Sequence, residues 1–153
     1  MKPSIFIIIL IALSGNTYSQ NGNYLSTKFE FISENNPSIN RIEYKKNLLT
    51  IQINEYQGQF LGGRILWELR ENNYSDSEFL EISLNSLMNS YYDQNSMAHI
   101  KVFKANILLM GQSVDIAVIY IWKFTSNNSF RIDLYDPTKK TTNRFDNISK
   151  LSI

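Results

Sequence analysis

Alternating apolar and polar residues run through much of the chain and predict β-strands. The alternation is strongest at residues 114–124, where every second side chain from Val114 to Trp122 is apolar and falls on one face. From Ala117 to Ile121 the opposite face is apolar as well, so we expect a central strand that is covered on both sides or that uses one face for association. The same pattern predicts strands over residues 28–33, 41–46, 48–55, 64–70 and 130–135.

One segment has the spacing of a helix instead. Its apolar residues recur at steps of three and four, which places them on one face of an α-helix: Leu80, Leu84, Leu87, Met88 and Tyr91. Ser75 and Glu78 supply a capping box at its start. The pattern predicts an amphipathic helix from Ser75 to Tyr92 that packs on the sheet.

Turns and tails separate these elements. Gly111-Gln112 and Ser126-Asn127-Asn128 predict tight turns between strands. Three glycines between Tyr56 and Gly63 predict a loop or a bulge. We expect residues 21–27 to be disordered and residues 138–153 to form a polar tail with a short helix at 146–151.

Together these elements predict an α+β fold in which an antiparallel β-sheet packs against one main amphipathic helix. The chain has 153 residues, of which 43% are apolar and 13% aromatic. That length suits one domain, which we place at residues 20–153.

The first nineteen residues have the pattern of a secretory signal peptide. Lys2 precedes a compact apolar stretch from Ile5 to Leu13, and small and polar residues follow up to a cleavage point after Ser19. The apolar stretch is shorter than the roughly 20 residues that span a bilayer. We therefore expect an exported protein, periplasmic or secreted, with no stable membrane anchor after cleavage.

Charge and cysteine content exclude several classes of function. The chain has 15 Lys and Arg against 14 Asp and Glu. Adjacent basic residues occur only at Lys45-Lys46 and Lys139-Lys140. Nucleic-acid binding needs a basic stripe, so we do not expect it. The absence of cysteine excludes disulfides, thiolate metal sites and a cysteine nucleophile.

The sequence offers few candidates for catalytic residues. His99 is the sole histidine, so a serine–histidine–aspartate triad or a histidine metal site must use it. Asp133 with Asp136, and Glu68 with Glu71, are spaced by three, which puts each pair on opposite faces of a strand. We expect no catalytic residue, no metal and no cofactor, and we keep a hydrolase that uses His99 as the minor alternative.

Aromatic residues are the best candidates for a binding surface. Nine Tyr, nine Phe and two Trp exceed what one small core holds, so some should be exposed. Tyr, Trp and Arg are enriched at protein interfaces. The candidate partner-binding residues lie in the glycine-containing segment, at the strand after it and at the end of the predicted helix: Tyr56, Phe60, Arg64, Tyr91 and Tyr92.

Residues 74–135 resemble the PsbP-like family, named for an extrinsic subunit of the photosynthetic oxygen-evolving complex. The similarity comprises the helix start Ser75-Asp76-Ser77-Glu78-Phe79-Leu80, the Gly111-Gln112 hairpin and the strand segment Ile119-Tyr120-Ile121-Trp122. The family's early Pro-x-Gly-Trp turn is absent here. The resemblance implies an α+β sandwich and a role in docking or assembly.

Three classes of function remain. The first is a non-enzymatic protein-binding or assembly module of the cell envelope, with an envelope or secreted protein as partner; an immunity protein against an exported toxin belongs to the same class. The second is a small-ligand or lipid-binding protein with a pocket between helix and sheet. The third is the hydrolase that uses His99.

Overall fold

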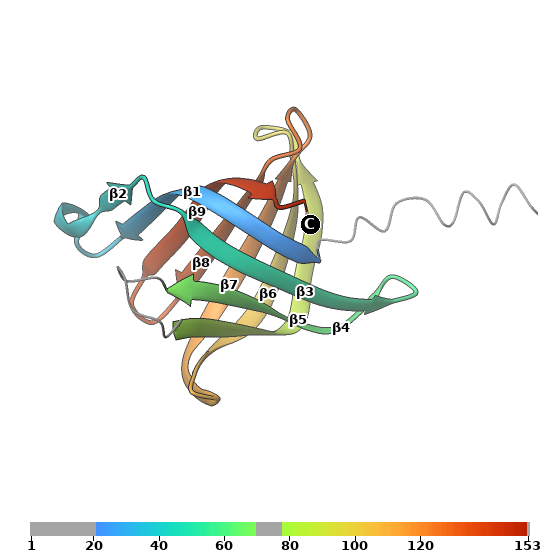
Figure 1. Ribbon diagram of the computed structural model, residues 1–153, viewed down its shortest axis with the longest axis horizontal. Helices are drawn as coiled ribbons and strands as arrows, with labels where there is room; N and C mark the ends of the chain where they lie inside the picture. Colours follow the sequence, from blue (N-terminus) through green and yellow to red (C-terminus); the bar gives the residue numbers. More distant parts are fainter. Residues whose placement is uncertain (1–20, 70–77, 153) are drawn as a thin grey trace, which may run out of the picture.

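The computed structural model describes residues 21–69 and 78–152, and it is built of antiparallel β-strands (Figure 1). The only helical element among these residues is one short 3-10 turn. The elements in chain order are β1 (Gly22–Ser33), η1 (Pro37–Ile39), β2 (Arg41–Glu43), β3 (Asn47–Tyr56), β4 (Gln59–Leu69), β5 (Glu78–Asp93), β6 (Ala98–Leu109), β7 (Gln112–Phe124), β8 (Phe130–Asp136) and β9 (Thr141–Lys150).

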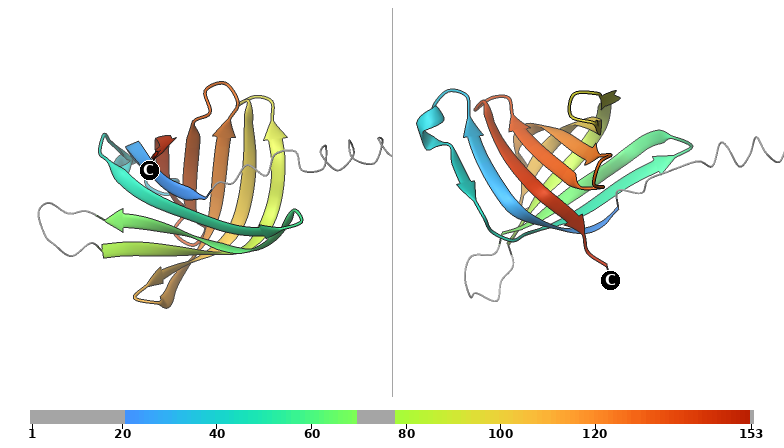
Figure 2. Two further views of the ribbon diagram at one scale, coloured as in Figure 1. Left: turned by 45° about the vertical axis from the view of Figure 1, so that its right-hand side comes forward. Right: turned by 90° about the horizontal axis from the view of Figure 1, so that it is seen from above.

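The sheet closes on itself because the first strand pairs with the last. β3 to β9 follow one another in chain order, and β1 completes the ring with β3 on one edge and β9 on the other. The pairing of β1 with β9 extends from Tyr24 opposite Lys150 to Ser33 opposite Thr141. The result is an eight-stranded antiparallel barrel, to which β2 adds three residues beside β1. Figure 2 shows β3 and β4 running across the direction of β6 to β8.

The barrel has two ends, which we name by the limits of β1. The Gly22 end carries the β3–β4, β5–β6 and β7–β8 turns and the last residues of β9. The Ser33 end carries the segment from β1 to β3 and the β6–β7 and β8–β9 turns.

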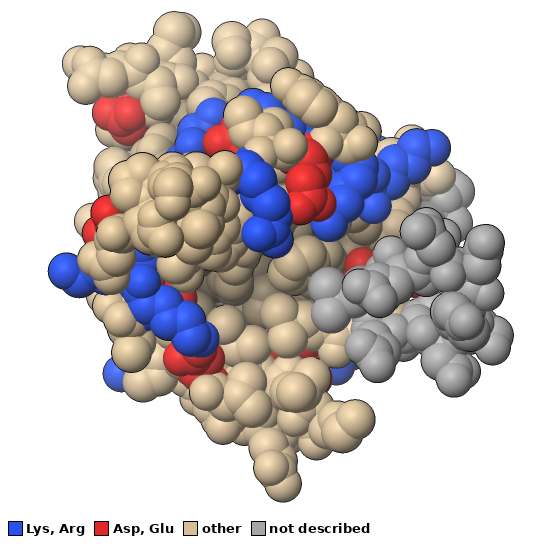
Figure 3. Space-filling view, turned by 90° about the vertical axis from the view of Figure 1, so that its left-hand side faces the viewer, with Lys and Arg blue, Asp and Glu red and all other residues tan. Residues whose placement is uncertain are grey.

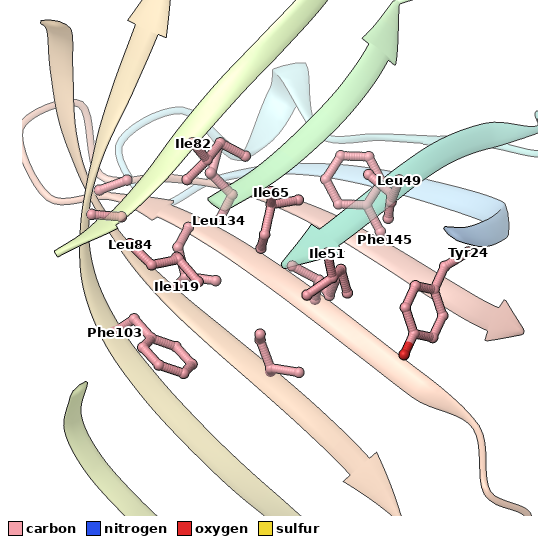
Figure 4. Close-up of a cluster of buried hydrophobic side chains, with 14 of the residues drawn as sticks. Tyr24, Leu49, Ile51, Ile65, Ile82, Leu84, Phe103, Ile119, Leu134 and Phe145 are labelled. Carbon is pink, nitrogen blue, oxygen red and sulfur yellow. The ribbon is translucent and has the colours of Figure 1, made fainter. Parts of the chain in front are cut away.

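Alternation along each strand fills the interior with apolar side chains. Inward positions on all eight barrel strands contribute to one buried cluster, ten of whose members are labelled in Figure 4. In its middle, Phe103, Ala105, Ala117, Ile119 and Ile121 have no solvent-exposed surface. A cavity able to hold water would expose the side chains that line it, so this part of the barrel is a packed core.

The predicted amphipathic helix is wrong, because residues 78–93 form the long strand β5. Leu80, Ile82 and Leu84 point inward at the even spacing of a strand. A register shift between Leu84 and Ser86 then inserts one residue, so the next inward side chain is Leu87. The step of three from Leu84 to Leu87 is therefore a β-bulge, and it has the same spacing as a helical turn. The proposed cap residues Ser75 to Ser77 lie outside the described residues.

The predicted α+β fold class is also wrong, because the described residues contain no main helix for the sheet to pack against. The fold is an antiparallel β-barrel. The predicted tails are also wrong in large part. β1 begins at Gly22 rather than after a disordered segment, and residues 141–150 form β9, which closes the barrel. The predicted final helix at 146–151 is thus mostly strand. The predicted signal peptide, residues 1–19, lies outside the described residues.

The other predicted strands are confirmed, although β1 begins at Gly22 rather than at residue 28, β4 begins at Gln59 rather than at residue 64, and β2 covers only Arg41–Glu43 of the predicted 41–46. The glycine-containing segment from Tyr56 to Gly63, predicted as a loop or a bulge, is a tight hairpin with a bulge. Asn54 and Glu55 stand opposite Gly62 and Phe60, which leaves Leu61 as the extra residue. Gly63 is packed against the neighbouring strand, where an added Cβ would lie 2.5 Å from the Gln52 carbonyl oxygen.

Candidate functional site

The outer surface of β6 and β7 carries a second apolar cluster, on the side of these strands that faces away from the core. Ala98, Ile100 and Val102 of β6 alternate with the inward residues, and Ile100 keeps only 1% of its surface exposed. The side chains that cover them come from β7: Val118, Tyr120, Trp122 and Phe124. This confirms the expectation that β7 is apolar on both faces.

Two rings and one cation form the centre of this cluster. The Trp122 and Phe124 rings are stacked, with centroids 6.4 Å apart and planes 16° apart. The guanidinium of Arg131, on the neighbouring strand β8, lies 5.6 Å from the Trp122 ring and 5.3 Å from the Phe124 ring. Such cation–π contacts hold the arginine over the aromatic surface. The Trp122 indole N–H is buried and has no hydrogen-bond acceptor.

The cluster continues onto β5 through Tyr91, which pairs with Ile100 and is 43% exposed. Trp122 pairs with Ile100 from the other side. The side chains of this surface therefore stand in rows across four neighbouring strands. We call it the outer aromatic face, and it consists of Tyr91, Tyr120, Trp122, Phe124 and Arg131.

A ladder of charges borders the outer aromatic face on β8, β9 and β1. Arg144 donates from Nε to Asp133 Oδ1 at 2.8 Å and from Nη2 to Asp133 Oδ2 at 3.1 Å. Its other terminal nitrogen lies 3.7 Å from Glu30. Asp133 stands opposite Tyr120 in the next strand, so the ionic row ends where the aromatic face begins.

A second charged region lies at the Ser33 end. Figure 3 looks onto the side of the molecule that lies at the left in Figure 1, and it shows charges of both signs side by side around a hollow. At this end Glu43 pairs with Arg41 and with Lys45. Hydrogen bonds from Lys45 and Arg41 lower the pKa of Glu43 below its ordinary value. One carboxylate thus stands between two cations, so charges of both signs lie together at this end.

The five residues proposed from the sequence do not form one surface. Tyr91 belongs to the outer aromatic face, whereas Tyr92 points to the opposite side of β5 and contacts the His99 ring at 4.9 Å. Phe60 packs inside the barrel on Phe103, with ring centroids 5.2 Å apart. Tyr56 is 65% exposed beside the β3–β4 turn, and Arg64 donates to Gln52 on the outside of β4.

The groups considered for catalysis are dispersed. Asp133 is held by Arg144, and Asp136 accepts hydrogen bonds from the backbone N–H groups of Thr138 and Lys139 in the β8–β9 turn. His99 is exposed at the Gly22 end. Within residues 21–69 and 78–152, no group of three or more metal-ligating side chains comes together. Glu71 lies outside the described residues.

No protein-family model, curated protein or solved structure matches this chain. The PsbP-like resemblance is therefore neither supported nor opposed by a relative. The α+β sandwich that it implied is overturned by the barrel. In the part of the chain that the structure describes, no helix is long and apolar enough to cross a membrane.

Sequence reasoning missed Trp122, Phe124 and Arg131 as site residues. The signal was the apolar character of both faces of residues 117–121. Only one face of a barrel strand lies in the core, so the other apolar face must lie on the outer surface. Without knowledge that the sheet closes, the second face could equally have been covered by a helix.

Proposed function

We propose that the protein is a non-enzymatic binding protein, and that it docks a protein partner on the outer aromatic face. The observation that supports this most directly is the stacked arrangement of Trp122 and Phe124 under Arg131, outside the barrel. Trp, Tyr and Arg are the residues that contribute most to binding at protein interfaces.

The packing of the face favours tight binding. The rings lie on Ala98, Ile100 and Val102, which are themselves buried, so little side-chain freedom remains to be lost when a partner binds. The second class considered from the sequence needs a pocket between a helix and the sheet. Residues 78–93, which were to form that helix, are strand β5.

The charges indicate what the partner presents. Arg131 Nε is 3.4 Å from Asp146, while its terminal nitrogens have no acceptor among the described residues. Asp133 at the border is already held by Arg144. A partner with an apolar patch and a carboxylate beside it complements this arrangement, because the carboxylate can pair with Arg131.

Export to the periplasm or the cell exterior is part of the proposal. Cleavage after Ser19 removes no described strand, since β1 begins at Gly22. The mass of the protein recovered from the periplasmic or culture fraction tests this point directly. Recovery of the full-length chain in the cytoplasm contradicts it.

Affinity capture from envelope extract, with quantitative mass spectrometry, tests the docking face. The full chain is expressed with a C-terminal tag, as wild type, as Tyr91→Glu and as Tyr56→Glu. Both tyrosines are exposed, but only Tyr91 lies on the outer aromatic face. We expect one stoichiometric partner with wild type and Tyr56→Glu, and its loss with Tyr91→Glu.

Equal loss with both variants, or retention with Tyr91→Glu and Trp122→Ala, contradicts docking on this face. Thermal unfolding of each variant shows that a lost partner is not the result of a lost fold. A partner that is captured must also rebind the purified protein, so that an accidental contaminant is not counted.

A further inference from the structure

Along its second half, β5 has a neighbouring strand on one side only. It pairs with β6 from Glu81 to Asp93, but with β4 only from Glu78 to Leu84. No described strand pairs with residues 85–93 on the side away from β6. We call residues 85–93 the β5 edge. The backbone N–H and C=O groups on the open side of such a strand are available to another strand.

Two register shifts within β5 account for this edge. One follows Leu84 and the next follows Leu87, and bulges of this kind bend a strand. The first half of β5 therefore runs along β4, and the second half runs along β6. Figure 2 shows the second half, in yellow, rising away from the β3–β4 hairpin, in green. A strand that joins the β5 edge displaces no described strand.

Side-chain exposure and one hydrogen bond show that the β5 edge is open. Met88 is 60% exposed and Tyr92 is 44% exposed. The Ser90 N–H donates to the Asn89 side-chain oxygen at 2.9 Å, within the same strand. A local side-chain acceptor of this kind competes with the carbonyl of a neighbouring strand. An incoming strand can replace it and extend the sheet.

The β5 edge lacks the charges that commonly keep strand edges apart. Residues 85–92 read Asn-Ser-Leu-Met-Asn-Ser-Tyr-Tyr, and none of them is charged at neutral pH. Natural edge strands often carry Lys or another charge, which opposes pairing with a second copy. Like charges directly opposite each other destabilise a pair of strands, and here there are none to oppose. The segment is therefore compatible with a second copy of itself.

We propose that two copies of this protein pair through their β5 edges, antiparallel, around a twofold axis near Ser90. A twofold interface brings the same segment of both copies together. In this register Tyr92 of one copy stands opposite Met88 of the other. Two exposed side chains then cover each other, and methionine sulfur makes favourable contacts with aromatic rings. Asp93 stands opposite Leu87 of the other copy, so the two Asp93 carboxylates do not meet.

This pairing is separate from docking on the outer aromatic face. It uses the open side of β5, whereas the outer aromatic face is the surface of β5 to β8 that points away from the core. The twofold axis of an antiparallel pair stands perpendicular to the sheet, so both outer aromatic faces lie on the same side of the dimer. A partner that contacts both faces at once gains affinity. Pairing can fail while docking holds, and the reverse.

Sedimentation equilibrium of the purified protein measures the pairing. One pair of strands makes a small interface, so we expect a monomer–dimer equilibrium with a dissociation constant of about 10–100 μM. Ser90→Lys should raise this constant roughly tenfold or more, because two ammonium groups then stand opposite each other. Ser149→Lys is the matched control, since Ser149 is an exposed serine on β9 with β1 beside it.

A pair of opposite charges at one position separates lost pairing from a damaged fold. Ser90→Glu alone should also weaken the dimer. An equimolar mixture of Ser90→Lys and Ser90→Glu should restore it, because the two copies then place opposite charges face to face. A variant that has lost its fold cannot give this result.

Three results overturn the proposal: a wild type that stays monomeric at about 0.5 mM, equal weakening by Ser149→Lys, or no association in the mixture. The first would leave the β5 edge to a strand of another protein. If the variants do not fold, amide hydrogen exchange of the wild type replaces them. Exchange at Ser90 and Tyr92 should slow as the protein concentration rises, and equal exchange at low and high concentration contradicts pairing.

Discussion

Lys101 of β6 and Glu55 of β3 form an ion pair across the Gly22 end of the barrel, although β4 and β5 lie between their strands in the sheet. The Nζ and Oε1 atoms are 2.7 Å apart, and about a quarter of each side chain is exposed. The pair therefore joins two strands that are not neighbours in the sheet. It also neutralises the one acidic group that faces into this end among the described residues.

Glu55→Gln should therefore change the free energy of unfolding little. Partly exposed ion pairs contribute at most about 1 kcal/mol to stability, and both side chains of this pair keep about a quarter of their surface exposed. Urea denaturation of the wild type and of Glu55→Gln measures the difference, and a loss well above about 1 kcal/mol would contradict this account.

Arg144→Ala should destabilise the barrel by about 3 kcal/mol. The substitution leaves the Asp133 carboxylate, which is only 6% exposed, without its two hydrogen bonds from the guanidinium. Arg64→Ala is the matched control, because Arg64 is an exposed arginine with one side-chain hydrogen bond to Gln52, and should cost less than about 0.5 kcal/mol. Chemical denaturation compares the two, and equal effects would show that the Arg144 ladder adds no stability.

Asp136 should make the stability of the barrel depend on pH in the acidic range. Burial raises the pKa of this carboxyl, but hydrogen bonds from Lys139 and Thr138 outweigh burial, so the pKa lies below its ordinary value. A lowered folded-state pKa means that the carboxylate stabilises the fold above its unfolded pKa of about 4, and that this contribution is lost as the pH falls through the folded value.

Asp136→Asn keeps an oxygen that can accept from the turn but cannot titrate. Its free energy of unfolding should change less than that of the wild type between pH 5 and pH 2, roughly the range in which such a carboxylate is protonated. Asp136→Ala should lose about 1–3 kcal/mol at pH 7, because two backbone N–H groups lose their acceptor. A wild type and an Asp136→Asn variant with parallel pH profiles would contradict this account.

Gly63→Ala should destabilise the barrel by about 1–3 kcal/mol, although alanine is the smallest possible addition. The new methyl group would meet the Gln52 carbonyl oxygen at 2.5 Å and the Ile53 Cα at 3.2 Å, and backbone atoms cannot move aside cheaply. Gly58→Asn is the comparison, since Gly58 has a positive φ of 77° but open space around it. Asparagine tolerates this conformation, so thermal unfolding should show a smaller loss there.

Much of the strand pattern could be predicted from the sequence, because alternation with a period of two reports directly which side of a strand is covered. The segment 114–124 shows this best, with both of its faces predicted as apolar and found so. Closure of the sheet could not be predicted in the same way. It depends on the pairing of residues such as Phe29 and Phe145, which lie far apart in the chain and leave no local signal.

The β5 error has a specific cause. Two register shifts in one strand, after Leu84 and after Leu87, change which side of the strand the apolar residues occupy. The resulting steps of three and four are those of a helix, and the Ser75–Glu78 capping pattern agreed with that interpretation. Several Leu and Met residues, which favour helices, added to the error, whereas pairing with β4 and β6 decided the outcome.

One of the five residues proposed from the sequence, Tyr91, belongs to the outer aromatic face. Tyr91 was identified as an exposed aromatic residue, and it is. The Trp122 and Phe124 rings lie on β7, about thirty residues later in the chain than Tyr91. Only the register of β5, β6 and β7 brings these rings and Tyr91 onto one surface.

The adjacency of β1 and β9 determines the order in which the barrel can be completed. Every other neighbouring pair in the barrel can form from segments close in sequence, but β1 must wait for a strand that ends at Lys150. During synthesis, which starts at the N-terminus, β1 therefore lacks one of its two neighbouring strands until nearly the whole chain has been made. Contacts over such sequence separations slow folding. Until that closure, the backbone groups along one edge of β1 have no neighbouring strand with which to form hydrogen bonds.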